Sequence, residues 1–231
     1  MSRPHLWIIA GPNGAGKTTL VTGGPFAEAL ASCQFVNPDQ ITQEYLKEQG
    51  IDSWREAPAD ILKTTFIRAA NEAQQRLEKA VEQGGAIAIE SVLSTRKYCR
   101  VVERVLELEG KFMLIYLMLN SPKISERRVR RRVLQEGHDV PLEKLEPRWR
   151  DSLGLLPWFA ARATRFWILD NSDDLMPDNP QPVVSGNEHA LTVYSVPPNS
   201  VREPLSNIVT EHAARERNSR WCFAFSANVT A

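Results

Sequence analysis

The chain of 231 residues is long enough for one α/β domain with a full hydrophobic core, or for one domain with an appendage. Its 28 Lys and Arg residues balance 28 Asp and Glu residues, so no net charge attracts nucleic acid or an acidic membrane surface. The three cysteines are far apart and fit no disulfide or zinc pattern, which predicts a reducing, cytoplasmic compartment. No apolar stretch approaches the roughly 20 residues that span a bilayer, so we expect a soluble protein.

Short apolar runs alternate along the chain with segments whose apolar residues follow helical spacing. The runs predict buried strands at residues 6–10, 86–90, 112–119 and 166–169. Helices are predicted from residue 16 to the glycines at 23–24, at 39–50, 58–83 and 95–109, from Pro122 through the arginines at 127–132, and at 141–162. Apolar strands that alternate with helices indicate a doubly wound α/β fold, with a parallel sheet covered on both sides.

The chain changes character after residue 171. Residues 172–200 are rich in Pro, Asn, Asp and Ser, with one strand-like run at 190–194, and a polar helix is predicted near 202–216. We expect residues 1–200 to form one domain, and residues 201–231 to form a C-terminal helix and tail to which the sequence assigns no role.

Polar residues follow the predicted strands at their carboxyl ends. A glycine-rich loop comes after the first strand, and Glu90, Asn120 and Asp170 stand at the ends of later ones. Because open parallel sheets bind ligands at this edge, the sequence predicts the functional site there.

The loop at residues 11–18 reads Gly-Pro-Asn-Gly-Ala-Gly-Lys-Thr and fits the phosphate-binding pattern GxxxxGK[ST] between a strand and a helix. Its glycines let backbone N–H groups surround a phosphate, Lys17 reaches the β- and γ-phosphates, and the Thr18 hydroxyl binds Mg²⁺. ATP and Mg²⁺ are the expected ligands, in a P-loop NTPase-type fold. The residues predicted to bind the nucleotide are Gly11, Pro12, Asn13, Gly14, Ala15, Gly16, Lys17, Thr18 and Thr19.

The same loop also looks like that of ABC-transporter ATPases. That class needs an LSGGQ-like signature and an apolar strand that ends in Asp-Glu. Neither occurs, since the strand before residue 90 ends in Glu90-Ser91 and Ser185-Gly186 is isolated. The absence of both features argues against an ABC ATPase.

Two carboxylates are candidates for work on a hydroxyl substrate. Asp39 follows an apolar pair about twenty residues after the loop, where it suits either a catalytic base or the N-cap of a helix. Glu90, at the end of its strand, suits either a contact to substrate or magnesium-bound water, or a solvated strand terminus.

The run Arg127-Arg128-Val129-Arg130-Arg131-Arg132 places Arg128 and Arg132 on one helix face, at i and i+4. In a P-loop kinase such a helix is a lid, whose arginines close over the phosphates. The run also suits a solvated face or a nucleic-acid stripe. Neutral net charge and the lack of interleaved aromatic residues disfavour nucleic acid.

Four segments together resemble the zeta toxin family of P-loop kinases, over roughly residues 6–200. They are residues 8–20 with the glycine loop, 35–39 (Phe-Val-Asn-Pro-Asp), 89–91 (Ile-Glu-Ser) and 137–141 (Gly-His-Asp-Val-Pro). The resemblance implies a doubly wound sheet with a helical lid, and ATP-dependent phosphorylation of UDP-N-acetylglucosamine on its sugar 3′-hydroxyl. It also implies a toxin that starves peptidoglycan synthesis and a small helical antitoxin that blocks the nucleotide site.

The resemblance also assigns roles to individual residues. Asp39 becomes the catalytic base, and Lys17 and Thr18 serve the phosphates and Mg²⁺. Glu90 binds the sugar, and Asn37 and Ser91 join it in the acceptor site, Ser91 standing where the family usually has Thr. Arg128 and Arg132 become catalytic lid arginines on the γ-phosphate, with Arg148 as a weaker candidate.

Two other functions fit the same residues. One is a kinase for a different hydroxyl substrate, such as a nucleoside or a nucleic-acid end. The other is a nucleotide-gated binding protein that transfers little phosphate and acts through partners.

Overall fold

The computed structural model describes residues 2–54, 56–134, 140–176, 179–187, 189–210 and 212. Residues 137–139 of the Gly-His-Asp-Val-Pro segment, the end of the predicted helix at 202–216 and the tail beyond it lie outside these ranges. Strands occupy β1 (His5–Ala10), β2 (Gln34–Val36), β3 (Ala86–Ser91), β4 (Lys111–Met118), β5 (Arg165–Asp170), β6 (Gln181–Asn187) and β7 (Leu191–Val193). Helices occupy α1 (Lys17–Gly23), α2 (Ala27–Leu30), α3 (Pro38–Glu48), α4 (Ala59–Gln83), α5 (Cys99–Glu107), α6 (Pro122–Leu134) and α7 (Leu145–Ala160), with single 3-10 turns η1 (Arg96–Tyr98) and η2 (Leu142–Lys144).

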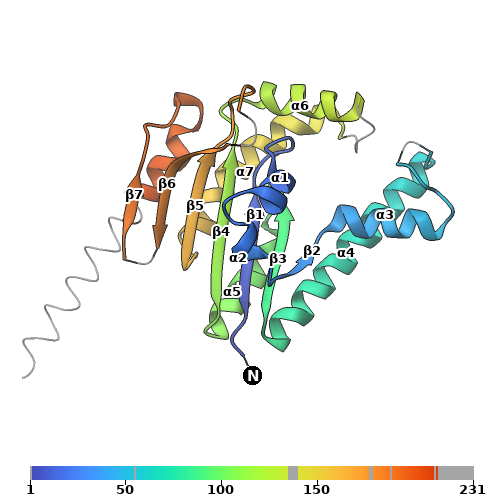
Figure 1. Cartoon of the computed structure of the whole chain (residues 1–231), viewed down its shortest axis with the longest axis horizontal. Helices are drawn as coiled ribbons and strands as arrows, with labels where there is room; N and C mark the ends of the chain where they lie inside the picture. Colours follow the sequence, from blue (N-terminus) through green and yellow to red (C-terminus); the bar gives the residue numbers. More distant parts are fainter. Residues whose placement is uncertain are drawn as a thin grey trace, which may run out of the picture.

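The strands form one sheet in the order β2-β3-β1-β4-β5-β6-β7 (Figure 1). The first five are parallel, which confirms the predicted α/β class, and β6 and β7 add an antiparallel edge. The sequence did not predict β6, because only Val183 and Val184 of its residues are buried and Pro182 interrupts it. The pairing of β5 with β6 shifts register beside this proline, between Ile168 and Leu169.

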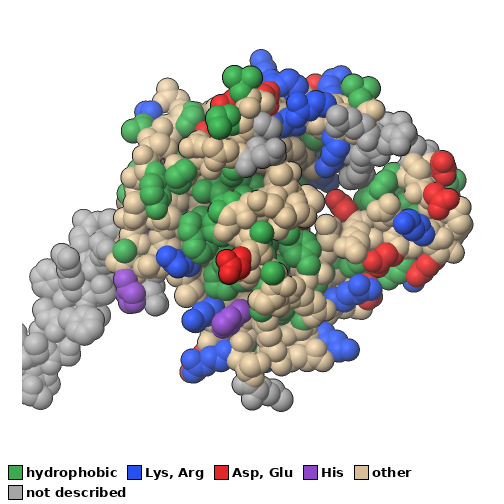
Figure 2. All heavy atoms as spheres, viewed as in Figure 1, with side chains coloured by type: hydrophobic (Ala, Val, Ile, Leu, Met, Phe, Trp, Pro, Cys, Tyr) green, Lys and Arg blue, Asp and Glu red, His purple; other side chains and the backbone are tan. Residues whose placement is uncertain are grey.

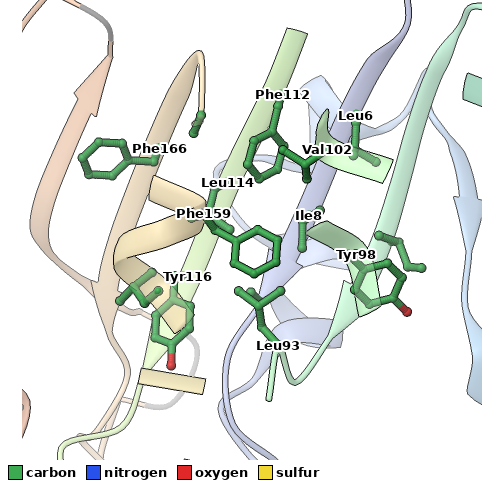
Figure 3. Close-up of a cluster of buried hydrophobic side chains, with 14 of the residues drawn as sticks. Leu6, Ile8, Leu93, Tyr98, Val102, Phe112, Leu114, Tyr116, Phe159 and Phe166 are labelled. Atoms are coloured by element: carbon green, nitrogen blue, oxygen red, sulfur yellow. The ribbon is translucent and has the colours of Figure 1, made fainter. Parts of the chain in front are cut away.

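The two faces of the sheet are covered unequally. Helices α4, α5 and α7 pack on one face, where the largest buried cluster includes Phe112, Phe159 and Tyr116 (Figure 3). The rings of Phe112 and Phe159 meet edge to face with centroids 6.4 Å apart. On the other face the short α1 and α2 cover a smaller cluster. Figure 1 shows α1 and α2 in front of β1.

A buried polar link connects the larger core to the carboxyl edge of the sheet. The hydroxyls of Tyr116 on β4 and Ser152 on α7 lie 2.8 Å apart. Ser152 also donates to the carbonyl of Val92, 2.6 Å away and directly after β3. Because buried polar groups need such partners, this link fixes the chain that follows Glu90 and Ser91.

Residues 199–210 form a helix that begins three residues before the predicted polar one. Its apolar residues Val201, Leu205 and Ile208 are buried in the main core cluster. The spacing of four and three residues makes the helix amphipathic rather than uniformly polar.

Helices α3 and α4 pack against each other and project from the β2 side of the sheet (Figure 1). The Arg68 guanidinium of α4 lies 3.8 Å from the centroid of the Tyr45 ring of α3. Helix α6 lies above the carboxyl ends of the strands, where the sequence predicted a lid (Figure 1). None of the helices in the described ranges is both long and apolar enough to cross a membrane.

Candidate active site

The glycine loop connects β1 to α1 in a conformation that depends on its glycines. Gly14 and Gly16 have φ angles of 76° and 89°, in the left-handed region that other residues rarely adopt. A Cβ on Gly11 would lie 2.2 Å from the Leu117 carbonyl oxygen, so the loop packs directly on β4. The Lys17 ammonium donates to the carbonyls of Gly11 and Pro12 at 2.8 and 3.0 Å. The loop therefore wraps around its own lysine.

A cleft of about 630 Å³ opens at this edge of the sheet, between the loop, α3, α4, α6 and the start of α7. Figure 2 shows the surface hollowed between the projecting α3–α4 pair and α6, over which Lys and Arg side chains gather. Every residue predicted to bind nucleotide, metal or acceptor lines the cleft except Gly11 and Pro12, whose carbonyls hold Lys17. The acceptor and catalytic candidates it brings together are Lys17, Thr18, Asn37, Asp39, Glu90, Ser91, Arg128, Arg132 and Arg148.

Helix α3 presents Asp39 to this cleft. The sequence left open whether Asp39 caps the helix, and the structure assigns the cap to Asn37, whose side-chain oxygen accepts from the Asp39 N–H at 2.9 Å. Pro38 occupies the first helical position, where its missing N–H costs nothing. The Asp39 carboxylate is therefore not the cap, and it is exposed along the cleft. The Asn37 side chain, which was predicted to bind the acceptor, caps the N-terminus of α3.

Glu90 lies against the phosphate loop rather than at a solvated strand end. The Thr18 hydroxyl donates to a Glu90 carboxylate oxygen at 3.2 Å. Burial raises the pKa of Glu90, against the opposing effects of Lys17 and the Thr18 hydrogen bond, and the Asp39 charge raises it further. The hydroxyl and carboxylate oxygens are hard donors that fit Mg²⁺ arriving with nucleotide phosphates.

Lys17 is the buried cation at the centre of this group. Burial lowers its pKa to about 8, although the Glu90 and Asp39 carboxylates oppose that shift; the Arg132 charge lowers it further. Charged side chains from α3, β3 and α6 thus all act on the lysine of the loop.

The lowered pKa of Lys17 predicts proton uptake when nucleotide binds. Phosphate charges raise the pKa in the complex, so near pH 8 the free lysine is partly neutral and the bound one is protonated. The affinity for nucleotide should be highest below this range, where free Lys17 is already protonated, and should weaken as the pH rises through about 8. Calorimetry at pH 8 in buffers of different ionisation enthalpy measures the uptake. A Lys17→Arg variant, which does not titrate there, should lose this component; equal uptake in both proteins would contradict the assignment.

The two predicted lid arginines, Arg128 and Arg132, have different surroundings in the structure. Arg132 lines the cleft close enough to Lys17 to affect its pKa. The Arg128 side chain is only 6% exposed, and its Nε lies 2.9 Å from an Asp174 carboxylate oxygen. Arg128 also donates to the Gly14 carbonyl at 3.3 Å, so much of its guanidinium is committed to protein groups.

Several residues of this region carried no assigned role in the sequence. Asn171, directly after β5, donates to the Ala15 carbonyl at 2.8 Å, and Asp174 pairs with Arg128. Lys97 and Tyr98 of η1 also line the cleft. A polar residue at a strand end was the available signal for Asn171, whereas Lys97, Tyr98 and Asp174 belong to no motif.

A strand–glycine loop–helix unit on a parallel sheet, with a buried lysine and carboxylates in one cleft beneath an arginine-bearing helix, defines an ATP-dependent phosphotransferase of the P-loop class. The chain belongs to the zeta toxin family, whose sequence model matches residues 1–152. No curated protein sequence matches the chain.

Solved structures share the fold at low sequence identity. The AvrRxo1-ORF1:-ORF2 complex aligns with a TM-score of 0.66 at 15% identity, over 94% of this chain and 74% of that one. The same complex with ATP aligns with a TM-score of 0.63 at 15% identity, over 93% and 81% of the chains. A structure from the PezAT chromosomal toxin–antitoxin system of Streptococcus pneumoniae aligns with a TM-score of 0.52 at 16% identity, over 93% and 88%.

Proposed function

We propose that this kinase transfers the γ-phosphoryl group of ATP to the 3′-hydroxyl of a UDP-activated amino sugar, UDP-N-acetylglucosamine, as the toxin of a toxin–antitoxin pair. The observation that carries the proposal is the common cleft in which Asp39 and Glu90 lie beside Lys17. One end of the cleft suits the donor phosphates, and its carboxylates suit an acceptor hydroxyl.

The side chains divide the chemistry between them. Asp39 accepts the proton of the attacking hydroxyl, and Glu90 orients the sugar by accepting hydrogen bonds. Lys17 and Arg132 stabilise the charge that develops on the transferred group. When bound, Mg²⁺ supplies further neutralisation of the phosphate oxygens, and Thr18 offers it a hydroxyl.

The charge of the cleft supports an acceptor that carries phosphate. Besides Asp39 and Glu90, the described lining residues include six cations, of which Arg128 is paired with Asp174. The others include Lys17, Lys97, Arg131 and Arg148, so cations outnumber carboxylates among the described lining residues. Such an excess favours two anionic ligands, the nucleotide and the diphosphate of a UDP-sugar.

We assign the acceptor diphosphate to Lys97, since it lines the cleft with Glu90 of β3 and belongs to neither the glycine loop nor α6. Its ammonium donates to the Ala70 carbonyl at 2.9 Å, which holds it against α4. We expect Lys97→Met to raise KM for the UDP-sugar about tenfold without changing kcat or the Kd for ATP. Steady-state kinetics with Lys79→Met, an exposed α4 lysine outside the cleft, as the matched control test this. An unchanged KM would remove Lys97 from the acceptor site.

The central experiment incubates the protein with ATP, Mg²⁺ and UDP-N-acetylglucosamine and follows the products by ³¹P NMR. A new sugar-phosphate resonance that Lys17→Ala abolishes is the expected result. If none appears at high enzyme concentration, the UDP-sugar proposal fails. Transfer to a nucleoside or to a nucleic-acid end in parallel reactions would then identify another acceptor class.

The toxin role requires a protein that restrains it, as in the toxin–antitoxin system to which the PezAT structure belongs. We expect a short helical antitoxin encoded beside this chain, which suppresses growth arrest on co-expression and competes with ATP. Growth that is unaffected by the wild-type kinase would contradict the toxin role while leaving the kinase activity open to the NMR assay.

A further inference from the structure

Three consecutive carbonyls of the phosphate loop accept hydrogen bonds from side chains outside the loop. The Ser125 hydroxyl donates to the Asn13 carbonyl at 2.5 Å, and Arg128 Nη1 donates to the Gly14 carbonyl at 3.3 Å. Asn171 Nδ2 donates to the Ala15 carbonyl at 2.8 Å. Two of these side chains come from α6 and one from the segment after β5, so elements distant in sequence meet at the loop.

These donors are built into the interior. Ser125, Arg128 and Asn171 are exposed by only 1%, 7% and 3%. Arg128 is the least exposed charged residue in the part of the chain that the structure describes. A buried charge is tolerated only where it is paired and hydrogen-bonded, so its partners indicate its task.

The partners of Arg128 lie on two elements. Its Nε pairs with Asp174, and its Nη2 donates to the Asp173 carbonyl at 3.1 Å. Asp174 also pairs with Arg127, the neighbouring residue on α6. Gly14 packs directly on this arginine, because a Cβ there would lie 3.0 Å from the Arg128 Cβ. The guanidinium thus joins α6, the loop and the segment after β5.

We propose that Ser125, Arg128 and Asn171 are positioning residues that hold the phosphate loop through its carbonyls, and that Arg128 is not a γ-phosphate arginine. A trans peptide is planar, with its N–H opposite its C=O. A carbonyl fixed by one of these donors therefore turns the N–H of the same peptide to the opposite side. Ser125 and Asn171 set the N–H groups of Gly14 and Gly16 in this way, for a phosphate to meet. Arg128 sets that of Ala15, which donates to the Pro12 carbonyl at 3.2 Å and closes the turn of the loop. This positioning role involves no acceptor, so it goes beyond the proposed function and is tested separately from it.

Binding of ADP distinguishes a loop-positioning arginine from a lid arginine. The loop surrounds the β-phosphate, which ADP and ATP share, whereas a lid arginine contacts the γ-phosphate, which ADP lacks. We expect Arg128→Met to raise the Kd for ADP and for ATP by the same factor, about tenfold, in calorimetry without acceptor. Arg128→Lys should behave like Arg128→Met, because an ammonium keeps the charge but not the fork of donors.

Arg130→Met is the matched control, since Arg130 is exposed on the same helix and pairs only with Glu126 among the contacts described. Its Kd values should equal those of the wild type. Asp174→Asn retains Arg128 but removes the carboxylate that orients it, so it should raise both Kd values together. This variant carries the test if Arg128→Met does not fold. A loss of ATP affinity with ADP affinity unchanged, or full rescue by Arg128→Lys, would overturn the proposal.

Discussion

Asp39→Asn is expected to slow phosphotransfer by roughly 10²–10⁴-fold while leaving the Kd for ATP unchanged or tighter. The substitution preserves the shape of the side chain and removes its ability to take a proton. Asn37 caps α3 and Pro38 opens it, so the helix does not need the Asp39 carboxylate. Its charge acts on Lys17 without forming an ion pair to it in the described contacts, so the loop should keep its conformation.

Single-turnover transfer and ATP calorimetry on the same preparation separate these effects. Asp60→Asn, an exposed carboxylate in the first turn of α4, provides a matched control on the same hairpin. A variant that transfers phosphate as fast as the wild type would eliminate Asp39 as the base. If the wild type and Asp39→Asn both bind ATP tightly and transfer no phosphate to any acceptor, the chain is better described as a nucleotide-gated binding protein.

Much of the sheet could be predicted from sequence because its central strands are buried on both faces. Such strands must be apolar throughout, and residues 112–119 were predicted from this pattern within one residue of β4 at each end. The same apolar pattern did not predict the antiparallel strand β6, since only two of its side chains are buried. Its pairing depends on the edge that β5 offers, a property of the assembled sheet rather than of the segment.

The site shows a similar division. Residue types with narrow chemical uses, the loop lysine and the glycines, mark the phosphate end directly in the sequence. An arginine in the sequence does not reveal its partner, because a guanidinium binds a carboxylate, a carbonyl or a phosphate equally well. Burial of Arg128 against Asp174 depends on how α6 lies over the segment after β5, which spacing along one helix cannot show. The i and i+4 relation correctly placed Arg128 and Arg132 on one helix but did not distinguish their surroundings.

Lys17→Ala is expected to abolish detectable transfer, with a fall of at least about 10²-fold, and to weaken ATP binding as well. Lys17 is buried and its ammonium is held by the Gly11 and Pro12 carbonyls, so the lysine both shapes the loop and meets the phosphates. Asp39→Asn should impair the chemical step alone; Lys17→Ala should impair donor binding and chemistry together.

Lys47→Ala, an exposed lysine in the last turn of α3, is the control for a general loss of positive charge. Thermal unfolding should show that Lys17→Ala remains folded, because removing a buried charge also removes the cost of burying it. Retention of both ATP binding and transfer by Lys17→Ala would mean that the donor phosphates bind elsewhere. The opposite effects of burial and of the neighbouring carboxylates on Lys17 make that outcome unexpected. Burial lowers the pKa of the lysine to about 8, and the negative charge of a bound phosphate raises it again, so the lysine is fully charged when the phosphate is in place.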